Sequence, residues 1–432
     1  MSVVTLTAIR AELLAVRADP REAGAEAVVH HADGLIVLEN GIVAAFGDHA
    51  HLAEQWRHVP VLDRRGLLLV PGFVDAHVHY PQTERIAAHG AQLLDWLERH
   101  IFPAEQAFAD RAHADAVAAF FLDELLRNGT TSALVFATVH STSVDALFAA
   151  ALARNMRIVS GKTLMDRNAP AGLTDTAESG RAESEALIAR WRGRGRLRYA
   201  VTPRFALTST PAQLESAGAL LAAHPDALLH THLSENLGEI DAVAAAFPEA
   251  ADYLDVYARY GLVGARSVFA HGIHLDEGAM ARLGEAGAAI AFCPTSNLFL
   301  GSGLFDLARA DASGVRVAVG TDVGAGTSFS ILHTLGEAYK VCQMRGASLD
   351  PFRALWLATG AGAAALHIAD RIGGLNVGQE ADFVLLDPAA TPLLARRTAG
   401  RSLTERLFAL QILGDDRAVA ETWVAGAVAH RR

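Results

Sequence analysis

The chain has few of the features that mark secreted or membrane proteins. Its 432 residues include only two cysteines, Cys293 and Cys342, which argues against a disulfide framework and is typical of a reducing compartment. No apolar run reaches the length that a membrane helix needs, and the N-terminus shows no signal-peptide pattern. We therefore expect a cytoplasmic protein with no membrane partner.

Basic residues are also scarce. Lys and Arg number 37 against 48 Asp and Glu, which gives a formal net charge of −11. Because nucleic acids are bound through patches of positive charge, this balance argues against a nucleic-acid partner and leaves small neutral substrates open. A hydrophobic content of 51% and a charged content of 20% are ordinary for a globular enzyme.

What the sequence does contain is a regular alternation of apolar strands and helices in its middle section. The expected strands cover residues 68–79, 132–137, 158–164, 197–202, 228–233, 267–271, 288–292 and 315–320. Eight strands that alternate with helices over roughly 300 residues predict an α/β fold, a (β/α)8 barrel.

The two ends of the chain share a different sequence pattern, in which short apparent strands are separated by glycines. Residues 2–16 and 33–48 read as strands, with Asn40-Gly41 as a hairpin turn signal, and residues 372–388 and 418–430 resemble them. We predict a small β domain built from both ends, with boundaries at 1–68 and 375–432 around a barrel at 69–374.

Polar residues gather where the predicted barrel strands end. Residues i and i+2 of a strand point to the same face, so His77 and His79 project together and can bind one divalent ion such as Zn²⁺. A His-x-His pair alone is more often structural, but the catalytic mouth of a barrel lies at the C-terminal ends of its strands. Other strand ends there supply His230, His232, Glu235, His271, His274 and Asp322.

Four segments give a more specific indication. "PGFVDAHVHYPQ", "LLDWLERHIFPAE", "HLSEN" and "GTDVGAGTSFSILHTLGEAYKV" together resemble the guanine deaminase family of the amidohydrolase superfamily. The resemblance runs from about residue 71 to residue 387. The histidines and the aspartate belong to the superfamily at large, whereas the Tyr-Pro-Gln, the "LLDWL…FPAE" segment and "GTDVGAGTSFS" are narrower and favour the guanine-acting branch.

The resemblance implies a mononuclear zinc site. Its ligands would be His77, His79, His232 and Asp322, with one zinc ion per subunit, although iron stays open. The fourth strand, "LRYAVTPRFAL", has no lysine that could bridge a second metal. Lys162 lies on the third predicted strand, where we expect a structural or rim role.

The resemblance also implies roles for the remaining site residues. Zinc would activate a water molecule, Asp322 and Glu235 would accept its proton, and Glu235 would protonate the adjacent ring nitrogen as general acid. His271 would hydrogen-bond the water or the oxyanion. Guanine would be held by Gln82, Arg204 and Phe205, and the products would be xanthine and ammonia.

Two other functions stay open from the sequence. One is deamination of a different aminated heterocycle, such as 8-oxoguanine, a pterin or a triazine, and the other is a non-catalytic scaffold. The complete set of ligands and the acid–base glutamate argue against the scaffold. Family resemblance implies a homodimer. The roles of His230, His274 and Trp96 are left unassigned.

Overall fold

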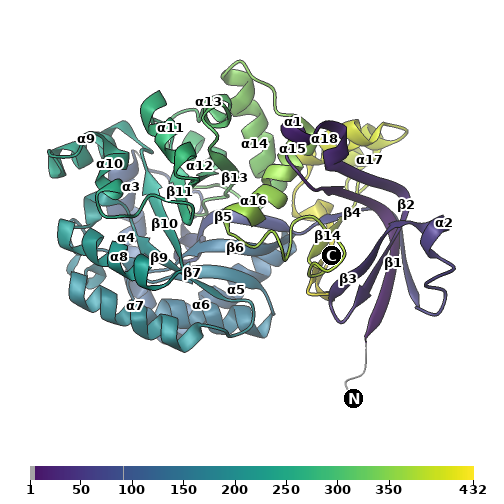
Figure 1. Cartoon of the computed structure of the whole chain (residues 1–432), viewed down its shortest axis with the longest axis horizontal. Helices are drawn as coiled ribbons and strands as arrows, with labels where there is room; N and C mark the ends of the chain where they lie inside the picture. The colour runs from purple at the N-terminus through teal and green to yellow at the C-terminus, as the bar shows by residue number, and fades with distance from the viewer. Residues whose placement is uncertain (1–4, 91) are drawn as a thin grey trace.

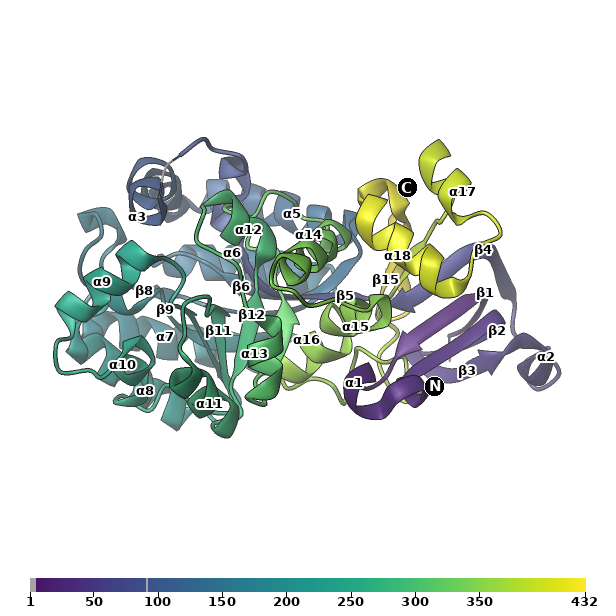
Figure 2. The ribbon, with the colours of Figure 1, turned by 90° about the horizontal axis from the view of Figure 1, so that it is seen from above.

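The computed structural model describes residues 5–90 and 92–432. A barrel lies on the left of Figure 1, and a smaller sheet made from both ends of the chain lies on the right. The view from above in Figure 2 shows the same two bodies side by side, with the C-terminal helices α17 (Pro392–Thr398) and α18 (Leu403–Leu413) beside the small sheet.

The barrel sheet of the described chain runs in the order β5-β6-β7-β9-β10-β11-β12-β13, all parallel, with the short β8 pairing to β9. The strands are β5 (Phe73–His79), β6 (Thr130–Phe136), β7 (Arg157–Gly161), β8 (Thr163–Leu164), β9 (Arg198–Pro203), β10 (Leu228–Leu233), β11 (Ser267–His271), β12 (Ala289–Phe292) and β13 (Arg316–Val319). The (β/α)8 prediction is confirmed.

Hydrogen bonds between the segment after β13 and strand β5 close the barrel, joining its last strand to its first. The His79 amide donates to the Val323 carbonyl at 2.7 Å, and the Asp322 amide donates to the His77 carbonyl at 2.9 Å. The Asp75 carboxylate adds to this closure by accepting from the Thr321 amide at 3.0 Å and from its hydroxyl. The first and last strands therefore meet where the predicted metal ligands lie.

Helices cover the outside of the barrel, as Figure 1 shows. Their bounds and those of the smaller helices are α1 (Pro20–Ala23), α2 (His49–Leu52), α3 (Leu93–Trp96), α4 (Phe102–Gln106), α5 (Arg111–Arg127), α6 (Ser141–Ala153), α7 (Ala177–Trp191), α8 (Pro211–Ala223), α9 (Leu237–Ala246), α10 (Tyr253–Ala258), α11 (Glu277–Glu285), α12 (Pro294–Phe299), α13 (Leu307–Ala312), α14 (Ile331–Met344), α15 (Pro351–Leu357) and α16 (Gly360–Ala365). A π-helical turn, η3 (Leu97–Ile101), joins α3 to α4.

The small sheet mixes strands from both ends of the chain, in the order β16-β15-β14-β4-β1-β2-β3. Its strands are β1 (Leu6–Val16), β2 (Val28–Glu39), β3 (Ile42–Asp48), β4 (Val61–Pro71), β14 (Phe383–Leu386), β15 (Val419–Val424) and β16 (Ala427–Arg431). Asn40 and Gly41, with φ of 52° and 81°, form the predicted turn between β2 and β3. Residues 2–4 of the first predicted strand lie outside the described residues.

The single strand predicted at 68–79 is wrong. The chain forms two strands there, because β4 pairs with β1 and β14 in the small sheet whereas β5 pairs with β6 in the barrel. Gly72 stands between them, where an added Cβ would lie 2.3 Å from the Thr131 hydroxyl oxygen. The last four residues of β4, 68–71, and the first two of β5 are apolar and buried. The apolar pattern of the sequence therefore continues across Gly72 and does not mark the change of sheet.

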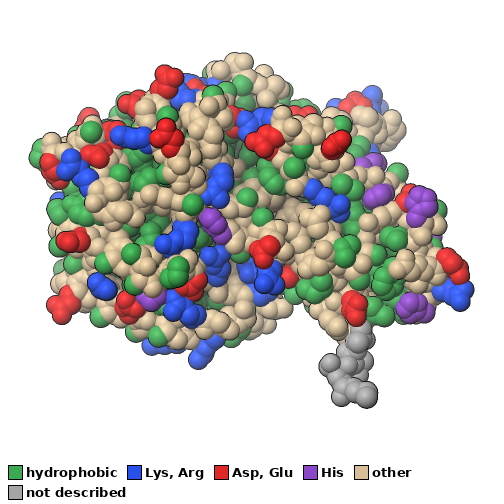
Figure 3. Space-filling view, in the orientation of Figure 1, with side chains coloured by type: hydrophobic (Ala, Val, Ile, Leu, Met, Phe, Trp, Pro, Cys, Tyr) green, Lys and Arg blue, Asp and Glu red, His purple; other side chains and the backbone are tan. Residues whose placement is uncertain are grey.

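The main hydrophobic core fills the space between the barrel strands and the surrounding helices. Among the described residues, no helix is both long enough and hydrophobic enough to cross a lipid bilayer. On the face shown in Figure 3, acidic and basic side chains are interspersed across the barrel.

Candidate active site

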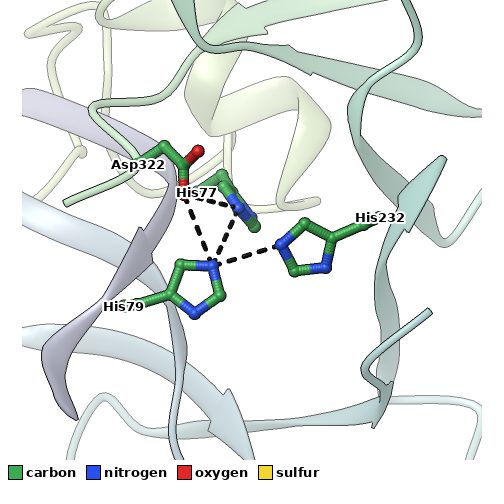
Figure 4. A group of neighbouring side chains, drawn as sticks. All are labelled: His77, His79, His232 and Asp322. Carbon is green, nitrogen blue, oxygen red and sulfur yellow. Dashed lines mark hydrogen bonds and ion pairs between the residues drawn. The ribbon is translucent and has the colours of Figure 1, made fainter. Parts of the chain in front are cut away.

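Four predicted metal ligands converge at one end of the barrel (Figure 4). The Nε2 atom of His79 lies 3.2 Å from Nε2 of both His77 and His232. Asp322 completes the group, because its Oδ1 lies 3.2 Å from His77 Nε2 and 3.4 Å from His79 Nε2. One donor atom from each residue lies within 4.8 Å of all the others. The structure therefore brings together residues from β5, β10 and the segment after β13.

The hydrogen bonds around this group suit it to a metal ion. His232 Nδ1 lies 2.8 Å from the Arg204 carbonyl, to which it donates, and His77 Nδ1 lies 2.7 Å from His230 Nε2, to which it can donate. A neutral imidazole that donates from Nδ1 carries its lone pair on Nε2. His77 and His232 therefore direct their Nε2 lone pairs toward His79 Nε2, which lies 3.2 Å from each of them. Three imidazole nitrogens this close together, with the Asp322 carboxylate beside them, form a donor set that fits a bound divalent ion.

Burial keeps these imidazoles neutral. Removal from water lowers the pKa of His77, His79 and His232 well below the ordinary value of a histidine. Neutral imidazole is the form that binds metal. A second group, formed by His271, Cys293 and Asp322, is also close together. Burial raises the pKa of the Cys293 thiol well above its usual range, which disfavours the thiolate that would bind a metal.

The predicted acid–base residue lies beside this donor set. Glu235 Oε2 is 3.4 Å from His271 Nε2, and Oε1 accepts a hydrogen bond from the Ser302 hydroxyl at 3.2 Å. Burial, opposed by His271 and aided by the nearby Asp322, raises the pKa of Glu235 to about 7. A carboxyl group with a pKa near neutrality can both accept and donate a proton.

His271 connects Glu235 to Asp322. Its Nδ1 donates to the Asn297 side-chain oxygen at 2.8 Å, and its Nε2 lies 3.7 Å from Asp322 Oδ2. Burial lowers the pKa of His271, but the carboxylates of Glu235 and Asp322 outweigh this and raise it overall. This arrangement suits a histidine that donates a hydrogen bond toward the centre of the site.

The backbone at the strand ends is held in an unusual conformation. Ser234, His271 and Asp322 all have positive φ, of 48°, 72° and 51°. Left-handed backbone is uncommon for residues other than glycine, and it collects at functional sites where the surrounding structure enforces it. Gly324 follows Asp322, and a Cβ there would lie 2.5 Å from the Gln82 carbonyl oxygen. The second glycine of the "GTDVG" segment, Gly324, therefore lets the backbone approach Gln82 closely.

The predicted substrate residues share one cavity with the predicted catalytic residues. The lining of this cavity includes Gln82, Arg204, Phe205, Glu235 and Trp96. The lining also includes His79, Leu93, Leu97, His232, Glu239, His271, Leu300, Asp322 and Ala325. Apolar side chains thus surround a cluster of polar ones.

The residues left unassigned by the sequence now have positions. His230 contacts the predicted ligand His77 from behind, whereas His274 Nε2 donates to the Ser302 carbonyl at 2.8 Å. Trp96 is buried, and its indole nitrogen donates to the Ala88 carbonyl at 3.3 Å. Lys162 pairs with Asp175 at 2.6 Å, which suits the structural role expected for it.

Sequence reasoning missed two buried glutamates. Glu105 accepts hydrogen bonds from Arg204. Glu239 accepts from the backbone amides of Glu235 and Asn236, at 2.9 and 3.1 Å, and from the Tyr253 hydroxyl at 2.6 Å. The Asn-x-x-Glu spacing at 236–239 is a capping-box signal that could have revealed the second. Glu105 is the last residue of the "LLDWLERHIFPAE" segment, so the family resemblance of that segment is the signal that could have pointed to it.

Known proteins resemble this chain along its length. A family model described as the amidohydrolase family matches residues 68–429. Guanine deaminase from Escherichia coli (strain K12) is 50% identical over 432 residues, which cover 99% of this chain and 98% of the relative.

Solved structures agree with this. One of E. coli guanine deaminase has a TM-score of 0.95 at 49% identity and covers 99% of this chain and 100% of its own. A second structure is that of guanine deaminase from C. acetobutylicum with bound guanine in the active site. It has a TM-score of 0.91 at 26% identity, and the match covers 98% of this chain and 100% of that chain. The chain belongs to the amidohydrolase family.

Proposed function

We propose that this chain hydrolyses guanine to xanthine and ammonia with one zinc ion per subunit. The observation that carries the proposal is one cavity that joins a four-donor cluster, a buried glutamate with a pKa near neutrality and a buried arginine. The 50% identity to E. coli guanine deaminase supports guanine as the substrate, as does the bound guanine in the C. acetobutylicum relative.

The metal would be held by His77, His79, His232 and Asp322. Three imidazole nitrogens and one carboxylate oxygen are donors that zinc accepts readily, and catalytic zinc sites leave a position open for water. When bound, the ion supplies Lewis acidity that makes water an effective nucleophile near neutral pH.

The protein's own residues handle the protons. Glu235 and Asp322 take the proton of the attacking water, and Glu235 delivers it to the ring nitrogen next to the carbon that bears the amine. His271, fixed by Asn297, donates a hydrogen bond to the oxygen that adds to the ring. The hydroxyl that has added to the ring then gives up its remaining proton, which Asp322 or Glu235 passes to the amine. The carbon–nitrogen bond breaks, ammonia leaves, and the new carbon–oxygen bond becomes a carbonyl.

Three residues would recognise the purine. Arg204 supplies a charged donor for the ring carbonyl, Gln82 supplies an amide that can both donate and accept, and Phe205 supplies an aromatic face. Phe205 belongs to an apolar cluster with Trp96, Phe102 and Leu300, which excludes water from one side of the cavity. Guanine is a planar, polar-edged ring that fits this combination.

A steady-state assay of zinc-loaded protein tests the proposal. Guanine conversion is followed by ultraviolet absorbance and by ammonia release, in parallel with 8-oxoguanine, a pterin and a triazine. We expect kcat/KM for guanine to exceed that for each alternative. Absence of guanine turnover by protein that carries a full complement of zinc would overturn the assignment, and preference for another ring would redirect it within the family.

We further propose a cytoplasmic homodimer. Both cysteines of the chain are free and buried, which suits a reducing compartment, and the dimer follows from family resemblance. Sedimentation equilibrium measures the oligomeric state. A molecular mass of one chain at micromolar concentration would refute the dimer.

A further inference from the structure

A buried ion pair lies behind the proposed recognition residues. Glu105 on α4 is fully buried, and Arg204, which follows β9, is 2% exposed. Both oxygens of Glu105 accept hydrogen bonds from Arg204 Nη1, at 2.9 Å from Oε1 and 2.7 Å from Oε2. The Arg204 guanidinium also lies 5.6 Å from the centre of the Phe102 ring. Buried charges are retained only when they are paired and hydrogen-bonded, which this pair satisfies.

The pairing leaves part of Arg204 free to act. Within residues 5–90 and 92–432, the hydrogen bonds of its side chain all use Nη1, while Arg204 itself lines the cavity. A guanidinium is a rigid planar fork. Fixing Nη1 against a carboxylate therefore restricts the direction in which Nη2 and Nε present their hydrogens, and these atoms are the donors that remain for a ligand.

Glu105 also contacts the second recognition residue. Gln82 Nε2 donates to Glu105 Oε1 at 3.3 Å, and Gln82 Oε1 accepts from the Gly324 amide at 3.3 Å. A carboxylate only accepts and a backbone amide only donates, so these two partners define which end of the Gln82 amide is oxygen. One carboxylate thus holds two residues on the same side of the cavity.

We propose that Glu105 is a positioning residue that sets the specificity of the cavity for a ring carbonyl, by fixing the donors of Arg204 and the amide of Gln82. This inference rests on the proposed function, because it concerns how the same site selects its purine. A heterocycle without the carbonyl would leave the fixed, buried donors of Arg204 unpaired, which is the strongest form of discrimination that a binding site can apply.

The test uses the full-length, zinc-loaded protein and two purines that carry no amine to remove. Hypoxanthine has the ring carbonyl, and unsubstituted purine lacks it. Calorimetric titration measures the dissociation constant of each purine with the unchanged protein and with the Glu105→Gln and Glu98→Gln variants. Glu98 is an exposed glutamate on η3, the turn that precedes α4, and serves as the control position. Guanine kcat and KM are measured on the same samples.

We expect Glu105→Gln to weaken hypoxanthine binding by about 10- to 100-fold and to leave purine binding and zinc content nearly unchanged. For guanine, KM should rise more than kcat falls, and Glu98→Gln should behave as the unchanged protein. A general loss of structure would instead weaken both purines equally, and that result would overturn the inference. Unchanged hypoxanthine binding in Glu105→Gln would do the same.

A double-mutant cycle separates positioning from an independent effect. If Glu105 acts through Arg204, adding Glu105→Gln to Arg204→Gln should weaken hypoxanthine binding by a much smaller factor than Glu105→Gln does in the unchanged protein, and the remaining factor measures its effect through Gln82. Two independent effects would instead multiply. Arg204→Gln leaves a buried carboxylate without its cation. If this variant does not fold, Arg204→Lys replaces it, because lysine keeps the charge but lacks the planar fork.

The outcomes also distinguish this inference from the proposed function. Hypoxanthine binding that depends on Glu105, in a protein that does not turn over guanine, would overturn the reaction and support the positioning role. Guanine turnover that is indifferent to Glu105 would support the reaction and overturn the positioning role. Failure of the unchanged protein to favour hypoxanthine over purine would also contradict the inference.

Discussion

Replacement of Glu235 by glutamine removes proton transfer while keeping the shape of the side chain and the four metal donors. Glutamine has nearly the same size and keeps an oxygen that can accept from the Ser302 hydroxyl, which lies 3.2 Å from the glutamate. Glu235 is outside the four-donor cluster, so metal binding should persist. What the amide cannot do is take up and return a proton.

The expected loss follows from that single function. General acid–base catalysis by a positioned side chain contributes typically about 10²- to 10⁴-fold, which corresponds to about 2.7–5.4 kcal/mol of activation free energy. We therefore expect kcat for guanine to fall by that factor, with KM changed far less. Glu215→Gln, at an exposed position on α8, serves as the matched control.

The assay combines stopped-flow absorbance with metal analysis of the same protein. If Glu235→Gln retained kcat within a few-fold of the unchanged enzyme while zinc stayed bound, the acid–base role would be refuted. A loss of activity that tracked a loss of zinc would show instead that the side chain supports the metal site rather than the chemistry.

Three further predictions concern residues around the site. His230→Ala removes a partner of one metal ligand and should weaken zinc affinity by about 10- to 100-fold, measured by competition with a chelator; unchanged affinity would contradict this. Gly324→Ala places a Cβ 2.5 Å from the Gln82 carbonyl oxygen and should lower kcat/KM by about 100-fold, whereas full activity would show that the loop yields. Lys162→Met leaves the buried Asp175 carboxylate without the ammonium 2.6 Å away and should reduce the free energy of unfolding by about 3–5 kcal/mol, read from urea denaturation, with kcat of the folded enzyme kept.

The barrel could be predicted from the sequence because its strands are buried on both faces. Such strands are continuous apolar runs separated by helices, and this pattern is largely local. The position where the chain leaves the small sheet could not be predicted in this way. The end of β4 and the start of β5 form one buried apolar run. Only their partners distinguish them, since β4 pairs with β1 and β14 whereas β5 pairs with β6.

The site residues also fall into those that the sequence predicts and those that only the fold brings together. His77, His79, His232 and Asp322 could be proposed because strand ends of a barrel converge and because those residue types bind metals. The pairings that hold the site residues in place could not be predicted from local sequence. Glu105 meets Arg204 across 99 positions of sequence, and His77 meets His230 across 153. Only the closed barrel brings such pairs together.

The dependence of turnover on zinc tests the central claim most directly. Metal-free protein is titrated with zinc, and the rate of guanine conversion to xanthine is plotted against the number of zinc ions bound per chain. The account predicts a rate that rises in proportion to bound zinc and levels off at one ion per chain. Turnover by the metal-free protein, or a rate that stays absent until a second ion binds, would contradict a single-metal guanine deaminase.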